Sequence, residues 1–367
     1  MSPIDDIIAE ARNGRPFILV DAEDRENEGD IVIPAQFATP DRIAFMAVQA
    51  RGLICLAITQ ERADALALAP MARHNGSGYG TAFTTSIEAR EGVATGISAH
   101  DRATTIAVAI DPELGPRDIV SPGHVFPLVA RTGGVLIRAG HTEAAVDIAR
   151  LAGLNQSGVI CEIMNDDGTM ARLPELEIFA DRHDLKIGTI ADLIAYRRRS
   201  ETLVQRVAEA PFDTVHGSGF RIVVYRNAID GSEHVALVRG NAAPGQPTLV
   251  RVHQIDLTAD MLGWSAAHRD YIPRALRALA AHDGPAVAVF VRDASPSSIS
   301  DRINGGRAAY QRTMAERDYG VGAQILRDLG VKDMILLSSS NTKLTALDGF
   351  GLRIVDRRPV PSLAADD

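Results

Sequence analysis

An acidic segment between two apolar runs constrains this chain most. Residues 21–30 contain six carboxylates and one arginine, and the apolar runs 17–20 and 31–33 flank them. Such short apolar runs predict buried β-strands, which would anchor the acidic segment as a loop at both ends. Crowded like charges repel one another unless water or a cation screens them. The segment is therefore either a solvated acidic loop or a site for a hard cation such as Mg²⁺, which prefers oxygen ligands.

Length and composition indicate a globular protein of two domains. The 367 residues suffice for two hydrophobic cores, and 46% apolar with 23% charged residues is ordinary for a folded chain. The net charge of −9 argues against a nucleic-acid partner, which requires a concentrated basic face. We also expect no membrane association, because no apolar run approaches the ~18–20 residues of a membrane span. Two cysteines make no disulfide framework and indicate a reducing, cytoplasmic compartment.

Helical and strand patterns alternate through the first half, which predicts an α/β domain over residues 1–200 with a mixed sheet flanked by helices. Helices are expected at 4–13, 142–151 and 190–199, and strands at 53–58, 104–110 and 134–138. Residues 201–213 are polar and aperiodic, so we interpret them as a linker.

Residues 214–367 predict a second α/β domain. Strands are expected at 220–225, 234–238, 249–253, 286–291 and 334–337, and helices at 272–281 and 319–329.

Residues 136–143 (LIRAGHTE) predict a turn that could hold a phosphate. A strand is expected to end at Arg138, the chain would turn through Gly140, and a helix would start near Thr142. The N–H groups at a helix N-terminus attract anions, and Arg138 adds a positive charge. His141 would then project at the mouth of the phosphate site. The alternative is an ordinary capped strand-to-helix turn.

Two further residues carry the chemistry of proton transfer. His124 lies in a segment bounded by proline and glycine, where a histidine serves either as a hydrogen-bonding surface residue or as an acid–base group. Glu162 stands inside the apolar run 159–164, and a buried carboxylate needs a partner or a role.

Taken together, segments 21–30, 122–127, 138–142 and 158–170 resemble 3,4-dihydroxy-2-butanone 4-phosphate synthase of riboflavin biosynthesis. The likeness runs from residue 5 to residue 198, in family order and spacing. It implies a lyase that converts D-ribulose 5-phosphate into L-3,4-dihydroxy-2-butanone 4-phosphate and formate, depends on Mg²⁺ or Mn²⁺, and works as a homodimer.

The resemblance also assigns roles to residues of this sequence. Glu26 and His141 would bind the metal, while His124 and Glu162 would be essential to catalysis. The sugar phosphate would contact Arg25, Glu26, Asp30, Arg138, Ala139, Gly140, His141, Thr142 and Glu162.

Segments 249–253, 317–326 and 349–355 resemble GTP cyclohydrolase II, which implies that fold for the second domain. That family binds zinc through three cysteines, and their positions here hold Asp256, Ala267 and Arg269. No cysteine follows Cys161, so a thiolate zinc site cannot form and we expect no zinc. Asp256 and His268 remain as two weak metal ligands.

Other parts of that second site also depart from the family. Arg292 is kept, but residues 293–298 (DASPSS) replace the nucleotide-binding segment, and Ala315 stands where a proton-accepting aspartate is expected. Arg317 and Lys343 are kept. We therefore expect a degenerate domain without cyclohydrolase activity. A bifunctional enzyme, or a module for nucleotide binding, flavin binding or assembly, are the alternatives.

Overall fold

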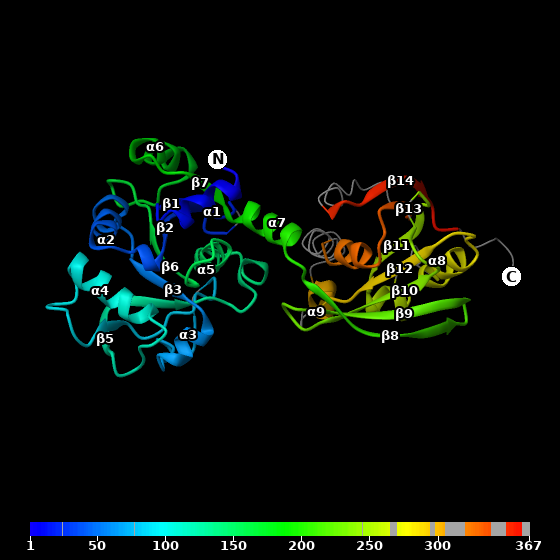
Figure 1. Ribbon diagram of the computed structural model, residues 1–367, viewed down its shortest axis with the longest axis horizontal. Helices are drawn as coiled ribbons and strands as arrows, with labels where there is room; N and C mark the ends of the chain where they lie inside the picture. The colour runs from blue at the N-terminus through cyan, green and yellow to red at the C-terminus, as the bar shows by residue number, and fades with distance from the viewer. Residues whose placement is uncertain are drawn as a thin grey trace. The chain divides into compact units, whose positions relative to one another are not determined.

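The structure is a computed structural model that describes residues 1–361 apart from 24, 77, 244, 265–269, 294–297, 305–319 and 339–349. The chain forms two compact units, Met1–Arg197 and Arg198–Asp367. In the described part, each unit has a seven-stranded mixed sheet flanked by helices (Figure 1). The α/β class predicted for both halves is confirmed.

The sheet of the first unit has the strand order β4-β5-β3-β6-β2-β1-β7. Its strands are β1 (Phe17–Val20), β2 (Gly29–Pro34), β3 (Cys55–Ile58), β4 (Ile87–Ala89), β5 (Ile119–Val129), β6 (Ser157–Glu162) and β7 (Ile187–Thr189). Buried strands β1 and β2 anchor the acidic segment at both ends, as predicted, and the structure pairs them antiparallel. The antiparallel register of β2 and β6 places Asp30 directly opposite Glu162.

Helices cover both faces of this sheet because successive side chains of a strand point to opposite sides. Phe17 and Leu19 join the core under α1 (Ile4–Arg12), α5 (His141–Leu151) and α7 (Ile190–Ser200). Ile18 and Val20 join the other core, with α2 (Pro40–Phe45), α3 (Gln60–Ala65), α4 (Ala99–Ile110) and α6 (Leu173–His183). The two cores thus hold the sheet rigid from both sides.

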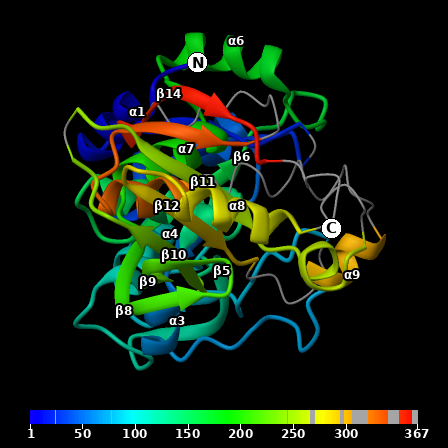
Figure 2. The same cartoon turned by 90° about the vertical axis from the view of Figure 1, so that its right-hand side faces the viewer.

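The second unit has the strand order β14-β13-β11-β12-β10-β9-β8, from top to bottom in Figure 2. Its strands are β8 (Val204–Thr214), β9 (Gly217–Asn227), β10 (Glu233–Arg239), β11 (Thr248–Gln254), β12 (Ala286–Val291), β13 (Asp333–Leu337) and β14 (Arg353–Arg358). Helix α8 (Tyr271–Ala280) packs on one face and a helix at 320–328 on the other. A short helix, α9 (Ser298–Asn304), lies between β12 and β13 in the chain. No described helix is long and apolar enough to cross a membrane.

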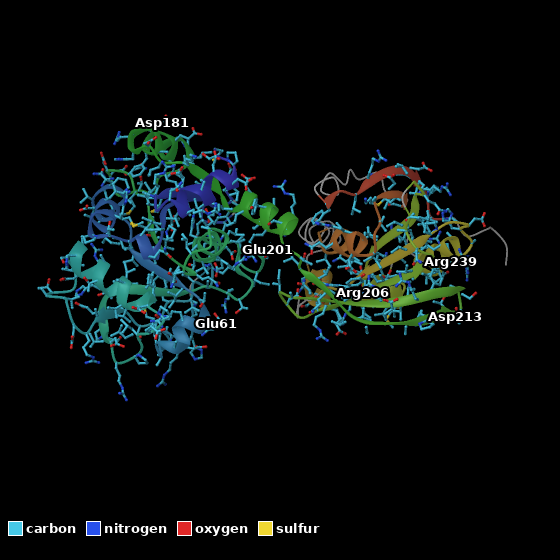
Figure 3. All side chains as sticks on the ribbon, viewed as in Figure 1. Glu61, Asp181, Glu201, Arg206, Asp213 and Arg239 are labelled. Atoms are coloured by element: carbon cyan, nitrogen blue, oxygen red, sulfur yellow. The ribbon has the colours of Figure 1, made fainter. Side chains whose placement is uncertain are left out.

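Charged side chains are distributed over the surfaces of both units (Figure 3). Glu61 on α3, Asp181 on α6 and Asp213 on β8 are exposed to solvent. They contrast with a small group of carboxylates in the first unit that are buried.

Two strands predicted for the first unit are wrong. Residues 104–110 belong to α4, whose start is capped by Ser98 accepting a hydrogen bond from the Asp101 amide at 3.0 Å. Short apolar runs do not distinguish helix from strand by themselves, and here the cap decides. Residues 134–138 contain the 3-10 turn Gly134–Leu136 instead of a strand. Gly133 and Gly134 both have positive φ angles, which a strand does not accommodate.

The linker predicted at 201–213 is also wrong, since β8 occupies most of it and pairs with β9 along the edge of the second sheet. Strand β8 was not predicted because its side chains are exposed and mostly polar. An edge strand lacks the apolar period of a core strand. The five strands predicted after it are confirmed. Several residues considered above lie outside the described residues: Asp24, Ala267, His268, Arg269, Ala315, Arg317, Tyr319 and Lys343.

Candidate active site

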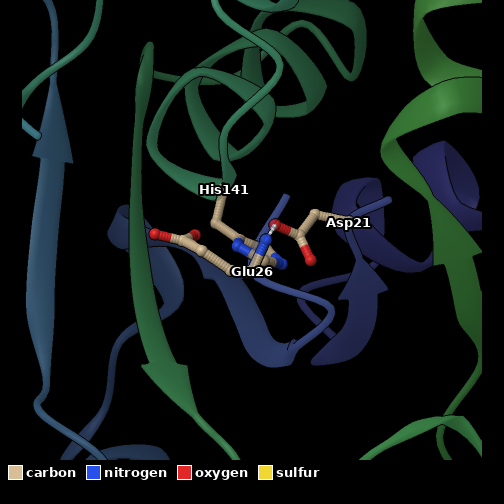
Figure 4. Close-up of side chains that lie close together, drawn as sticks. All are labelled: Asp21, Glu26 and His141. Atoms are coloured by element: carbon tan, nitrogen blue, oxygen red, sulfur yellow. Dashed lines mark hydrogen bonds between the residues drawn. The ribbon is translucent and has the colours of Figure 1, made fainter. Parts of the chain in front are cut away.

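Three potential metal ligands lie close together where β1 ends and α5 begins in the first unit (Figure 4). Asp21 directly follows β1, Glu26 lies in the loop before β2, and His141 is the first residue of α5. One ligand atom of each lies within 4.8 Å of the others. Sequence analysis paired Glu26 with His141 but missed Asp21, whose position immediately after a buried strand was the available signal.

The acidic segment is an organised loop. The Asp21 side chain is fully buried and accepts hydrogen bonds from the amides of Glu26 and Glu28, at 3.2 and 2.9 Å. Arg25 donates to the same carboxylate at 2.6 Å and also bonds Glu26. These contacts fix the buried Asp21 carboxylate and hold Glu26 beside Arg25, whereas Glu23 is exposed, so the loop is solvated only in part.

His141 is poised as a neutral ligand. Its Nε2 lies 3.2 Å from the carbonyl oxygen of Leu19, which can only accept, so Nε2 carries the hydrogen and Nδ1 keeps its lone pair. Nδ1 lies 3.8 Å from Oδ1 of Asp30. Burial lowers the pKa of His141 to about 4, with the positive charge of Arg25 adding to the effect. The ring is therefore neutral near pH 7, the form that binds metals.

Asp30 and Glu162 form a pair of neighbouring carboxylates across β2 and β6. Burial raises the pKa of Asp30 well above its usual value, and the charge of Glu162 raises it further. Burial also raises the pKa of Glu162, against the lowering effect of the hydrogen bond that its Oε2 accepts from the Leu53 amide at 2.8 Å. Among the described residues, Oδ1 of Asp30 is buried without a hydrogen-bond partner. Burial and the neighbouring negative charges therefore favour the protonated form of these carboxyl groups.

The turn that was predicted to hold a phosphate has a different local structure from the one expected. Arg138 follows the 3-10 turn instead of ending a strand, and α5 begins at His141, one residue before Thr142. Gly140 is the N-cap residue, and no side chain caps this helix. Ala139 is exposed and Thr142 is buried. The first N–H groups of α5 are thus available to an anion beside the guanidinium of Arg138.

Tyr79 contacts both Arg25 and Arg138 of the site. This residue was not predicted from the sequence. Its hydroxyl donates to the carbonyl oxygen of Arg25 at 2.5 Å, and the Arg25 guanidinium lies 5.1 Å from the centre of its ring. Its own carbonyl oxygen accepts from Nε of Arg138 at 3.0 Å. A single aromatic residue in the glycine-rich stretch 76–80 was the only signal for this role.

His124 lies apart from the other predicted residues. It is on β5, not in a loop, and its Nδ1 is 3.0 Å from Oε2 of Glu88 on β4. Strand β3 separates β5 from β6, which carries Glu162. Within the described part of the chain, the His124 ring forms no hydrogen bond with the acidic loop or α5. The structure therefore gathers the other predicted residues around β1, β2, β6 and α5, but not His124.

In the second unit, Asp256 acts as a helix cap. Its Oδ1 accepts from the amides of Thr258 and Ala259, at 3.0 and 3.1 Å, and from the Thr258 hydroxyl at 2.6 Å. Nearby, Nε2 of His253 lies 2.8 Å from Oδ2 of Asp260. Among the described residues, the three-ligand group Asp21, Glu26 and His141 has no counterpart in this unit.

Fold and site together define a class of protein. This is a two-domain α/β protein whose first unit has the construction of a metal-assisted enzyme for a small anionic substrate. The family model for 3,4-dihydroxy-2-butanone 4-phosphate synthase matches residues 5–196, and that for GTP cyclohydrolase II matches residues 205–359. The chain therefore belongs to the 3,4-dihydroxy-2-butanone 4-phosphate synthase family, with a GTP cyclohydrolase II domain following.

Relatives with both domains carry two kinds of name. A protein of Neisseria meningitidis serogroup B named 3,4-dihydroxy-2-butanone 4-phosphate synthase is 48% identical over 357 residues, covering 97% of each chain. The riboflavin biosynthesis protein RibBA of Aquifex aeolicus is 49% identical over 374 residues, covering 97% of this chain and 92% of its own.

Solved structures agree with the fold. The crystal structure of RibBX from A. baumannii, described as a two-domain 3,4-dihydroxy-2-butanone 4-phosphate synthase, is 43% identical with a TM-score of 0.77. The match covers 98% of this chain and 100% of that one. A 3,4-dihydroxy-2-butanone 4-phosphate synthase in complex with two magnesium ions is 41% identical, with a TM-score of 0.53. This match covers 55% of the present chain and 98% of the chain in that structure.

Proposed function

We propose that the first unit converts D-ribulose 5-phosphate into L-3,4-dihydroxy-2-butanone 4-phosphate and formate in riboflavin biosynthesis. The observation that carries the proposal is the meeting of Asp21, Glu26 and His141 at the N-terminus of α5, beside Arg138. One side of this arrangement suits a divalent cation and the other a phosphate group. Family membership supports the same activity.

The donor set fits Mg²⁺ or Mn²⁺. Carboxylate oxygens and a neutral imidazole suit these ions, and the unpartnered, buried Oδ1 of Asp30 lies close to the imidazole. Glu26 and His141 would be the ligands, and Asp21 holds Glu26 in place through its amide. When bound, the ion supplies Lewis-acid stabilisation of negative charge on substrate oxygens. A homologous synthase described with two magnesium ions supports this choice.

The phosphate of the substrate would lie at the start of α5. The guanidinium of Arg138 and the N–H groups of His141 and Thr142 can donate to it, with Ala139 and Gly140 lining the turn. Arg25, on the acidic loop, would contact the sugar. Holding the substrate at one end keeps its reactive carbons aligned with the carboxylates at the other.

Proton transfer would rest on Glu162, Asp30 and His124. Carboxyl groups with raised pKa values can take a proton from the carbon beside the ketone and return it near neutral pH. His124 lies apart from them on β5, although the family resemblance gives it an essential role. We propose that a homodimer resolves this separation, with His124 reaching the site of a second copy.

For the second unit we propose a degenerate domain without cyclohydrolase activity and without zinc. Asp256, at a position where the family has a zinc-binding cysteine, uses its oxygen to cap a helical turn. Relatives of full length that are named only as the synthase support the loss. Others named RibBA favour the second candidate, a bifunctional enzyme. A third candidate is a nucleotide-binding, flavin-binding or assembly module.

One assay tests these proposals. The purified full chain is incubated with ribulose 5-phosphate and Mg²⁺, or with GTP and Zn²⁺, and formate is measured in both. We expect formate only from ribulose 5-phosphate, and its release should stop when EDTA removes the metal. No formate from the sugar phosphate would refute the synthase activity, and enzymatic release from GTP would establish the bifunctional alternative. Calorimetry with GTP and flavins tests the module, which requires measurable binding.

A further inference from the structure

Two buried carboxylates on α5 hold the loop that carries Arg138. Glu143 and Asp147 are 1% and 4% exposed and lie one helical turn apart, so they share a face of the helix. Asp147 accepts a hydrogen bond from the Val135 amide at 2.8 Å, and Glu143 accepts one from the Arg131 amide at 3.0 Å. The loop is therefore attached to the helix at two points before the chain reaches Arg138.

The guanidinium of Arg138 is fixed by three acceptors. Nε donates to the carbonyl oxygen of Tyr79 at 3.0 Å, and Nη2 donates to the hydroxyl of Thr81 at 3.0 Å. Nη1 donates to Oε2 of Glu143 at 2.6 Å. A guanidinium has five N–H donors, so, counting partners among the described residues, one N–H on each Nη atom remains for a ligand. Its plane is thus set before any substrate arrives.

Gly140 shows how closely this pair is built into the turn. A Cβ atom at residue 140 would lie 2.3 Å from Nη1 of Arg138 and 2.9 Å from Oε2 of Glu143. Any side chain there would displace the ion pair, because distances of this size are shorter than van der Waals contact. The arginine and the glutamate consequently pack directly on the N-cap residue of α5.

We propose that Glu143 and Thr81 are positioning residues that orient the guanidinium of Arg138. Arg138 and the N-terminus of α5 then present one fixed set of hydrogen-bond donors to the phosphate of the substrate. This inference rests on the proposed function of the site. A free arginine side chain would lose rotamer entropy on binding, and prior fixation removes that cost. Neither residue touches the reacting carbons in this role, so their effect should appear in substrate affinity.

The test uses Glu143→Gln and Thr81→Val in the full chain. Glutamine has one side-chain oxygen, so it cannot accept from both the Arg131 amide and the Arg138 guanidinium as the Glu143 carboxylate does. Valine keeps the shape of threonine but lacks the hydroxyl acceptor. We expect each variant to raise KM for ribulose 5-phosphate about ten-fold, the effect of one hydrogen bond to a charged group. The Mg²⁺ concentration for half-maximal rate should stay unchanged. A merely structural defect would instead lower kcat through loss of folded protein and leave KM unaltered.

Glu10→Gln is the matched control. Glu10 is a 5% exposed carboxylate on α1 that pairs with the more exposed Arg15 and Lys186, so the substitution removes the ion pairs of another buried carboxylate in the same unit. Its KM should equal that of the wild type. Calorimetric titration with inorganic phosphate supplies a second readout that needs no turnover, and both test variants should bind phosphate about ten-fold more weakly.

The outcomes separate this inference from the proposed function. Wild-type KM and phosphate affinity in both variants would overturn the positioning role. If the wild type releases no formate, the proposed synthase activity is refuted. The positioning role of Glu143 and Thr81 is then tested by phosphate calorimetry alone. Absence of phosphate binding to the wild type would then overturn it too. If Glu143→Gln does not fold, as judged by circular dichroism, Thr81→Val decides.

Discussion

His141 in the first unit and His253 in the second are both buried, but their partners differ. His141 donates from Nε2 to a main-chain carbonyl and keeps Nδ1 beside the unpartnered Oδ1 of Asp30. His253 has Asp260 at Nε2 and the Arg251 guanidinium 3.3 Å from Nδ1. Because a metal needs a free lone pair, the first arrangement is open to a ligand and the second is closed by the protein itself.

The same contrast separates Asp21 from Asp256. Both follow or nearly follow a strand and accept main-chain N–H groups. Among the described residues, only Asp21 belongs to a group of two carboxylates and a histidine whose ligand atoms lie within 4.8 Å of one another. The two sheets have equal numbers of described strands. A sheet of this kind can therefore persist whether or not the polar groups at its strand ends remain available for chemistry.

The largest effect is expected from substitutions that remove the proposed metal ligands of the first unit. Glu26→Ala and His141→Ala should each reduce formate release from ribulose 5-phosphate by roughly a thousand-fold or more, because charge stabilisation by the metal is lost. His253→Ala, the matched change in the second unit, should leave that rate unchanged. Formate assays give the rates, and circular dichroism confirms folding. Near-normal activity in Glu26→Ala or His141→Ala would refute the metal assignment.

The separate position of His124 leads to the second prediction. His124→Ala and Glu26→Ala should each be inactive alone, and mixing them after reversible dissociation should restore about a quarter of wild-type activity through heterodimers with one intact site. The readout is formate release from the mixture, with sedimentation to establish the dimer. No recovery from a mixture shown to contain heterodimers would place His124 within its own subunit's site or outside catalysis.

A smaller effect is expected from the organisation of the acidic loop. Asp21→Asn weakens the bond to Arg25 and the hold on the amides of Glu26 and Glu28. We expect the Mg²⁺ concentration for half-maximal rate to rise about 10- to 100-fold, as for other groups that orient metal ligands. Magnesium titrations of activity measure it. Unchanged magnesium dependence would show that the loop keeps its shape without this carboxylate.

The smallest effect concerns the second unit. Asp256→Ala removes a helix cap and should lower the free energy of unfolding of that unit by about 1 kcal/mol. Denaturant titration measures the change, with Asp213→Ala on the exposed part of β8 as a control. Formate release from ribulose 5-phosphate should be unaffected. A loss of zinc-dependent activity on GTP in Asp256→Ala would show that this residue serves catalysis and not only capping.

Local sequence patterns predicted much of the fold, whereas the roles of the candidate site residues were predicted from the family resemblance. Five strands of the second unit were predicted because their apolar runs are buried on both faces, and α5 because its apolar residues recur at helical spacing. The errors fall where a local rule is ambiguous. Residues 104–110 form a helix because Ser98 caps it, and β8 escaped prediction because it is an exposed edge.

The sequence by itself determined which chemical groups are present and where the chain turns: six carboxylates between two apolar runs, an arginine before a glycine turn, and no cysteine in the second half. The tertiary structure alone decided which groups meet. It set Asp30 opposite Glu162, gave Asp21 a place beside His141, connected Arg138 to Glu143 and Tyr79, and left His124 with Glu88. The physical reason is that strand register and helix packing bring distant residues together, whereas propensity and periodicity act only between near neighbours in the chain.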